Sequence, residues 1–130
     1  MSWTKGQKYE QLAEKYLKSK GYLILDRNWH AGVYGEIDLI CRKDRTLVFV
    51  EVKGRSSRFA KEDCLTAIDK SKAKKLLYSM QSYLDYLETT KKIYSPKVRF
   101  DLLVVVEDKL KQEFEVEQFE NISLFDLLES

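Results

Sequence analysis

The sequence has few of the residues on which several common types of site depend. Of its 130 residues, one is histidine (His30), one is proline (Pro96) and two are cysteine (Cys41 and Cys64). Two isolated cysteines exclude a CxxC metal knuckle, and a zinc site would need both thiols and His30 to converge from distant segments. A serine or cysteine nucleophile would depend on His30, which has no nucleophile motif near it. Any catalysis is therefore expected to use carboxylates and lysines.

Long hydrophobic runs are also missing. The longest stretch without a charged residue is residues 76–84, nine residues, whereas a membrane-spanning helix needs about 20 mostly apolar residues. Residues 1–6 contain no apolar block before a cleavage site, so nothing indicates export. We therefore expect no membrane segment and a cytoplasmic location.

What the chain does contain is a globular composition with an uneven distribution of charge. Apolar residues make up 44% and charged residues 34%, and the length fits one domain over residues 1–130. The net charge is +9 over residues 1–100 and −7 over residues 101–130. Residues 53–75 hold eight basic and three acidic side chains. This run is either a surface that faces phosphate or an ordinary solvated loop and helix face.

The hydrophobic periodicity predicts alternating helices and strands. Helices are expected at about residues 4–20, 66–87 and 122–128. Strands are expected at residues 22–28, 36–41, 47–53, 98–106 and 114–117, with a loop at 30–35. The fourth strand is apolar at consecutive positions, so it should be central, and the fifth should lie at an edge. This order indicates an α/β fold.

The hairpin predicted for residues 36–53 places charged residues together. If the two central residues of its polar linker form the turn, residues whose numbers add up to 89 lie opposite each other. Asp38 then faces Glu51, and Glu36 faces Lys53, all on one face of the sheet. A register shifted by one would separate them onto opposite faces.

Two directly opposed carboxylates repel each other, so their presence beside a lysine calls for a compensating cation or partner. Oxygen ligands favour a hard ion such as Mg²⁺ or Mn²⁺, held by Asp38 and Glu51. With Lys53 to orient a water or screen a phosphate, the group suits phosphodiester hydrolysis. The alternative is an ordinary ladder of charged residues on a solvated sheet face.

Two segments of the chain resemble a known family. Residues 35–40 (GEIDLI) followed by residues 48–55 (VFVEVKGR) resemble the YraN family of bacterial proteins, which is similar to the archaeal Holliday junction resolvases of the restriction-endonuclease-like, PD-(D/E)xK, superfamily. The resemblance extends over about residues 6–106. It also includes GQKYE at 6–10, RNW at 27–29, Ala67, Lys72 and RFD at 99–101.

The resemblance implies a restriction-endonuclease-like, three-layer α/β fold with a central mixed sheet flanked by helices. It implies that Asp38 and Glu51 are the acidic metal ligands and that Lys53 is the catalytic lysine. Glu10 matches a glutamate of the resolvases' first helix and is expected to assist catalysis. Glu36 matches a recurrent position, either catalytic or simply paired with Lys53.

Two cations complete the expected site. Arg55 lies two residues beyond Lys53, on the same strand face if the strand continues, and could bind backbone phosphate. Lys72 could bind phosphate or have a purely structural role.

The favoured hypothesis is a metal-dependent endonuclease that acts on DNA, including branched DNA, with Mg²⁺ or Mn²⁺ as cofactor. A homodimer would suit paired cuts on two strands. The alternative is a non-catalytic nucleic-acid-binding module that keeps the nuclease fold, and a protein–protein adaptor using the acidic end ranks last.

Overall fold

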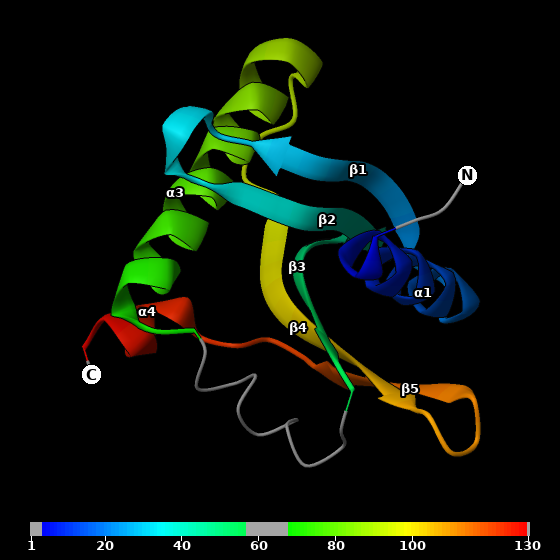
Figure 1. The fold of residues 1–130 in the computed structure, drawn as a ribbon. Helices are drawn as coiled ribbons and strands as arrows, with labels where there is room; N and C mark the ends of the chain where they lie inside the picture. Colours follow the sequence, from blue (N-terminus) through cyan, green and yellow to red (C-terminus); the bar gives the residue numbers. More distant parts are fainter. Residues whose placement is uncertain (1–3, 57–67, 130) are drawn as a thin grey trace.

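The computed structural model describes residues 4–56 and 68–129, which form a five-stranded sheet with helices on both faces (Figure 1). The alternation of helices and strands predicted from the sequence is confirmed. Its elements are α1 (Lys5–Ser19), β1 (Leu23–His30), the 3₁₀ turn η1 (Gly32–Tyr34), β2 (Glu36–Lys43), β3 (Thr46–Arg55), α3 (Lys70–Tyr86), the π-helical turn η3 (Leu87–Lys91), β4 (Lys97–Asp108), β5 (Glu113–Phe119) and α4 (Leu124–Leu128).

The strands follow one another in chain order, β1-β2-β3-β4-β5. Strands β3 and β4 are parallel, and every other neighbouring pair is antiparallel. The sheet is therefore mixed, as the resemblance implied. Strand β4 is buried from Phe100 to Val106 and pairs on both sides, but the middle position belongs to β3. Strand β5 lies at the edge, as predicted.

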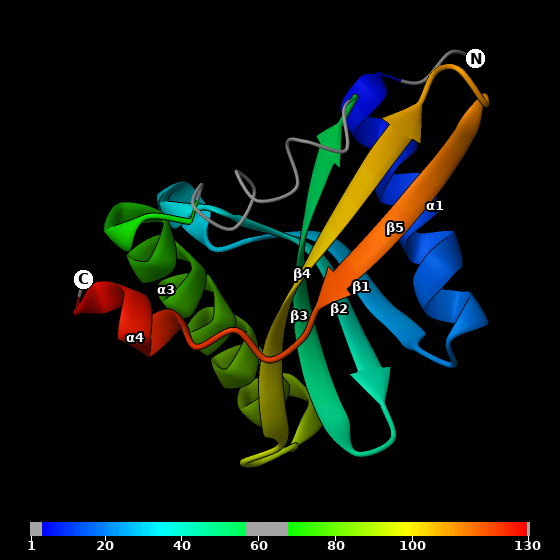
Figure 2. The ribbon, with the colours of Figure 1, turned by 90° about the horizontal axis from the view of Figure 1, so that it is seen from below.

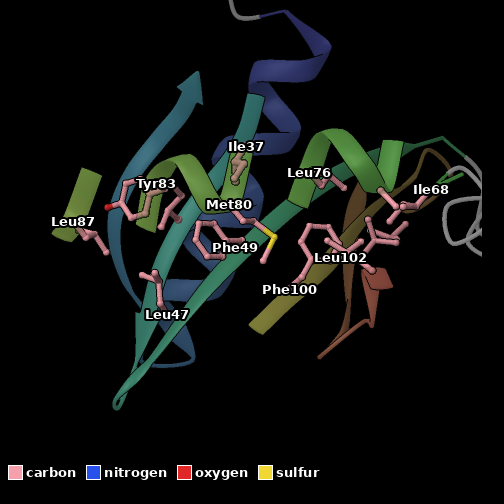
Figure 3. Close-up of a cluster of buried hydrophobic side chains, with 14 of the residues drawn as sticks. Ile37, Leu47, Phe49, Ile68, Leu76, Met80, Tyr83, Leu87, Phe100 and Leu102 are labelled. Atoms are coloured by element: carbon pink, nitrogen blue, oxygen red, sulfur yellow. The ribbon is translucent and has the colours of Figure 1, made fainter. Parts of the chain in front are cut away.

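The sheet separates two hydrophobic cores, which gives the three layers. Strand β3 supplies both, because its side chains alternate between the two faces. Phe49 enters the core beneath α3, where its ring meets Tyr83 edge-on at 5.8 Å (Figure 3). Val48 and Val50 enter the core beneath α1. Helices α1 and α3 thus cover opposite faces of the sheet (Figure 2).

Helix α1 is fixed at its start and along its length. The Thr4 hydroxyl accepts a hydrogen bond from the Gln7 backbone amide, and the Gln7 side-chain oxygen accepts one from the Thr4 backbone amide, which is a capping box. One turn beyond Glu10, the Glu14 carboxylate accepts hydrogen bonds from Nε and Nη2 of Arg27 in β1. The hydrogen bonds from Arg27 lower the pKa of Glu14 to about 2. This pair ties α1 to β1 and explains the arginine of the RNW segment.

Asp69 caps the start of α3, and its side chain accepts a hydrogen bond of 2.8 Å from the Lys72 amide. The start predicted at residue 66 falls in the segment outside the described residues. The helix buries Ala73, Leu76 and Met80 against the sheet, at the spacing of one helix face. Within residues 4–56 and 68–129, no helix is long and apolar enough to cross a membrane.

Candidate active site

The pairing of β2 with β3 ends beside the acidic residues. The two strands pair from Lys43 with Thr46 to Leu39 with Val50, so the predicted register is confirmed over these five pairs. Beyond Leu39, β2 remains paired with β1, and beyond Val50, β3 remains paired with β4. The two strands therefore diverge at this point, and the sheet opens between them.

Asp38 lies where the strands diverge. Its Oδ2 accepts a hydrogen bond of 2.8 Å from the backbone amide of Val52. A side-chain oxygen of β2 thus takes a bond that a strand carbonyl would otherwise accept. This contact holds the Asp38 carboxylate at the opening, next to the segment of β3 that carries Glu51.

Glu51 is the most buried acidic group of the site. Its side chain is 6% exposed, and its Oε1 lies 3.5 Å from Nζ of Lys53 and 3.4 Å from Nζ of Lys72. Lys53 is two residues further along the same strand, and Lys72 comes from the first turn of α3. The structure therefore brings both lysines to Glu51, although they are separated by 19 positions in the sequence.

Four carboxylates from three elements influence one another at this opening. Burial and then the charge of Glu51 raise the pKa of Asp38 to about 7, although the hydrogen bond from the Val52 amide opposes this change. Burial and the charges of Glu36 and Glu51 raise the pKa of Glu10 on α1. The predicted catalytic residues Glu10 of α1, Asp38 of β2 and Glu51 of β3 therefore lie close enough for electrostatic interaction.

Glu36 has a different neighbour from the one expected. The predicted position opposite Lys53 is not part of the β2–β3 ladder, because the strands have already diverged there. Glu36 pairs instead with His30 of β1, and its Oε2 lies 3.7 Å from the His30 Nε2. Of its two expected roles, the ion pair with Lys53 is absent from the described residues, and the catalytic role stays a prediction.

Arg55 lies at the end of β3, and its Nη1 donates a hydrogen bond of 2.8 Å to the Gly54 carbonyl. Its side chain is only partly buried. A contact between its guanidinium and a phosphate remains a prediction.

Gly54 is a site residue that the sequence analysis did not identify. A Cβ built on Gly54 would overlap the ring of Tyr9 in α1, so this ring packs directly against the backbone of β3. Glu10 is the next residue of the helix. A glycine within a strand often marks such a close approach, which is the signal that could have found it.

Replacing Gly54 with alanine is expected to push Tyr9, and with it the start of α1, away from β3. We expect a loss of about 1–3 kcal/mol in the free energy of unfolding from overpacking. Urea denaturation followed by circular dichroism measures this loss. Gly6→Ala is the control, because no atom lies within 4 Å of a Cβ built there. Equal stability of the two variants would contradict the close approach of α1.

The chemistry of Asp38 and Glu51 fits a hard divalent cation. Both supply carboxylate oxygens, and a cation between them would offset the repulsion that raises the pKa of Asp38. No three acidic, histidine or cysteine side chains within the described parts of the chain form a cluster suited to holding a metal. Mg²⁺ needs only one or two carboxylates, since it keeps several waters and also binds substrate phosphate.

A mixed sheet between helices, with two acids and a lysine where neighbouring strands diverge, is consistent with the restriction-endonuclease-like fold. The sequence model described as Uncharacterised protein family UPF0102 matches residues 9–105. The chain belongs to this family, which is the YraN family. The match spans every residue predicted for the site.

Curated relatives cover most of the chain. A UPF0102 protein of Syntrophomonas wolfei is 43% identical over 102 residues, which is 76% of this chain and 82% of the relative. One from Lawsonia intracellularis is 38% identical over 122 residues, 92% of this chain and 85% of the relative. One from Campylobacter hominis is 35% identical over 119 residues, 92% and 93% of the two chains. Their names give the family and no activity.

Proposed function

We propose that this protein is a metal-dependent endonuclease that hydrolyses phosphodiester bonds of DNA, with branched DNA as the expected substrate. The observation that carries the proposal is the position of Asp38 and Glu51. The strands diverge beside the buried Glu51 and the partly buried Asp38, with Lys53 on the same strand as Glu51 and Lys72 on α3. Repelling carboxylates are costly to the fold, so a site that keeps them is best explained by the cation they bind.

Each residue has a distinct role in this proposal. Asp38 and Glu51 would hold Mg²⁺ or Mn²⁺, which would stabilise negative charge on the phosphate and lower the pKa of a bound water. Lys53 would donate a hydrogen bond from Nζ to the attacking water or to the scissile phosphate. Lys72 would bind a neighbouring phosphate, and Glu10 would orient water at the edge of the site.

The phosphate backbone of the substrate would be held by cations outside the metal site. Arg55 follows Lys53 on β3 and is the candidate for this contact, because guanidinium groups bind phosphate through paired donors. DNA binding should therefore weaken as the salt concentration rises.

One observation favours a second function, a nucleic-acid-binding module without catalysis. Two ammonium groups lie within 3.5 Å of the Glu51 carboxylate. These lysines can neutralise Glu51 without a metal ion. A protein with this arrangement could bind DNA through the same cations and leave the backbone intact.

A cleavage assay separates the two functions. The protein is incubated with a labelled four-way junction and a linear duplex of the same sequence, in Mg²⁺, Mn²⁺ or EDTA. We expect cleavage of the junction that requires the metal, and a rate at least about 100-fold lower for Glu51→Gln. Glu88→Gln removes the same charge from an exposed position on η3 and should cleave at the wild-type rate.

Two results would count against the nuclease. Cleavage by Glu51→Gln at the wild-type rate would contradict the site assignment. Salt-sensitive binding of every DNA tested, with no cut in either metal, would support the binding module instead.

A further inference from the structure

A second candidate site lies at the far end of α3 from the carboxylates. A cleft of about 510 Å³ opens between the end of α3, the turn η3, the segment leading to β4 and the β2–β3 hairpin. Tyr86 of α3 borders the cleft, and Lys72 of the same helix borders the carboxylate site. The two residues are 14 positions apart, which corresponds to about 21 Å along a helix.

The polar lining of this cleft is mainly cationic. Arg42 and Arg45 of the hairpin and Lys91 of η3 line it, and all three side chains are exposed. Within the described residues, none of the three takes part in an ion pair. The acid in the lining is Asp26, and its Oδ2 already accepts a hydrogen bond of 2.6 Å from the Tyr83 hydroxyl. The described lining therefore carries three cations against one carboxylate, an excess of positive charge.

The remaining lining is apolar and partly aromatic. Tyr86 is held against Trp29 and Tyr83, with ring centroids at 5.0 and 5.8 Å. Ile93, on the facing segment, is 46% exposed, and Pro96 lies close by. Such surfaces lose contact with water when a flat, weakly polar ring covers them. The aromatic contacts keep Tyr86 in place for such a ring.

Cations beside aromatic and aliphatic surface match the chemistry of a nucleotide, in which an anionic phosphate is attached to a base. We propose that this cleft binds an unpaired strand of nucleic acid, with its phosphates on Arg42, Arg45 and Lys91 and a base against Tyr86. That this nucleic-acid strand is part of a substrate rests on the proposed nuclease function. The site would favour DNA in which a single strand continues from the point of cleavage.

The test measures binding without metal, so it does not depend on cleavage. A fluorescein-labelled 12-nucleotide oligothymidylate is titrated with protein in EDTA, and its anisotropy is recorded. We expect Arg42→Ala/Arg45→Ala to weaken binding at least about tenfold, and Lys91→Ala alone to weaken it about threefold. Circular dichroism verifies that each variant is folded.

The matched control is Lys109→Ala/Lys111→Ala, which also removes two exposed cations. These lysines lie in the β4–β5 turn, at the opposite end of the sheet from the β2–β3 turn (Figure 2). We expect the control to weaken binding less than twofold. Equal losses in the cleft and control variants would overturn the proposal, because they would show only general attraction to positive charge.

A second readout reports on the cleft itself. In a Trp3→Phe background, Trp29 is the only remaining tryptophan, and it contacts Tyr86. We expect its emission to change when the oligonucleotide binds, and unchanged emission at saturation would overturn the proposal. Competition by thymidine monophosphate as strong as that of the oligonucleotide would assign a free nucleotide as ligand. Equally strong competition by oligoglutamate would assign an acidic peptide, and either result would overturn the unpaired strand.

Junction cleavage by the same variants separates this proposal from the nuclease function. If the wild type cleaves and the cleft variant binds oligothymidylate as tightly as the control, the cleft assignment fails while the nuclease stands. If no protein cleaves and only the cleft variant loses binding, the nuclease fails while the cleft stands.

Discussion

Replacing Asp38 with asparagine is expected to abolish junction cleavage and, at the same time, to stabilise the metal-free protein. Asparagine keeps an oxygen that can accept the hydrogen bond from Val52. It removes a buried negative charge that Glu51 repels. The substitution thus takes away a metal ligand and relieves a cost to the fold. A purely structural acid would give the opposite result for stability.

The sign of the stability change follows from the pKa of Asp38. Its pKa rises from 3.8 to about 7 on folding, because of burial and then the charge of Glu51. The folded protein therefore holds this proton more tightly than the unfolded chain does. The contribution of Asp38 to stability falls as the pH rises from about 4 to about 7, and it stays low at higher pH. The span between the two values corresponds to up to about 4 kcal/mol.

Urea denaturation of the wild type and of Asp38→Asn in EDTA, at pH values from 4 to 8, measures this difference. We expect similar stabilities near pH 4 and a growing advantage of the variant toward pH 8. Asp85→Asn, at an exposed position of α3, should show no such growth. In the cleavage assay, Asp38→Asn should be at least about 100-fold slower than the wild type. A variant that is less stable than the wild type at pH 8 would contradict the strained position of Asp38.

The β2–β3 register could be read from the sequence because two independent constraints agree. A short polar linker fixes which residues face each other, and a slip by one residue would move Phe49 out of the core beneath α3 and Val48 out of the core beneath α1. The resemblance then pointed to Asp38 and Glu51 as a pair. These local rules determined the part of the site that lies within the hairpin.

The geometry just beyond that register could not be read in the same way. The divergence after Leu39 depends on β1 and β4, which hold the two strands of the hairpin from outside. Extending the register therefore gave the wrong neighbour for Glu36, which lies beside His30. The hydrogen bond from Val52 to Asp38 has the same origin, because it forms only where the strand pairing stops.

The sequence also could not predict contacts between distant segments of the chain. The close contact between Gly54 and the Tyr9 ring could be predicted only if the path of α1 over the sheet were known. The cleft proposed to bind nucleotides requires the hairpin and η3 to meet, although its lining residues Arg45 and Lys91 are 46 positions apart in the chain. Hydrophobic periodicity predicts which face of each helix or strand is buried. It does not predict which distant segments line the same cleft.

Replacing Asp101 with alanine is expected to destabilise the protein more than any other substitution considered. Its side chain is completely buried and accepts two hydrogen bonds from Arg99, at 2.9 and 3.0 Å. It also accepts bonds from the Gln118 side chain at 2.8 Å and from the Asn121 amide at 2.9 Å. The carboxylate therefore joins β4 to β5 and to the segment that leads into α4. This network gives the RFD motif a structural role.

Alanine at position 101 would leave the Arg99 guanidinium, 21% exposed, without its main anionic partner. Breaking a buried pair in this way costs about 3–5 kcal/mol. Urea denaturation should show this loss, and Glu88→Ala, at an exposed position, should change stability by less than about 0.5 kcal/mol. Arg99→Ala/Asp101→Ala completes a double-mutant cycle and should be less destabilised than the sum of the single variants, since neither charge is left alone. Additive losses, or a cost below about 1 kcal/mol for Asp101→Ala, would contradict the role of this network in holding β4, β5 and α4 together.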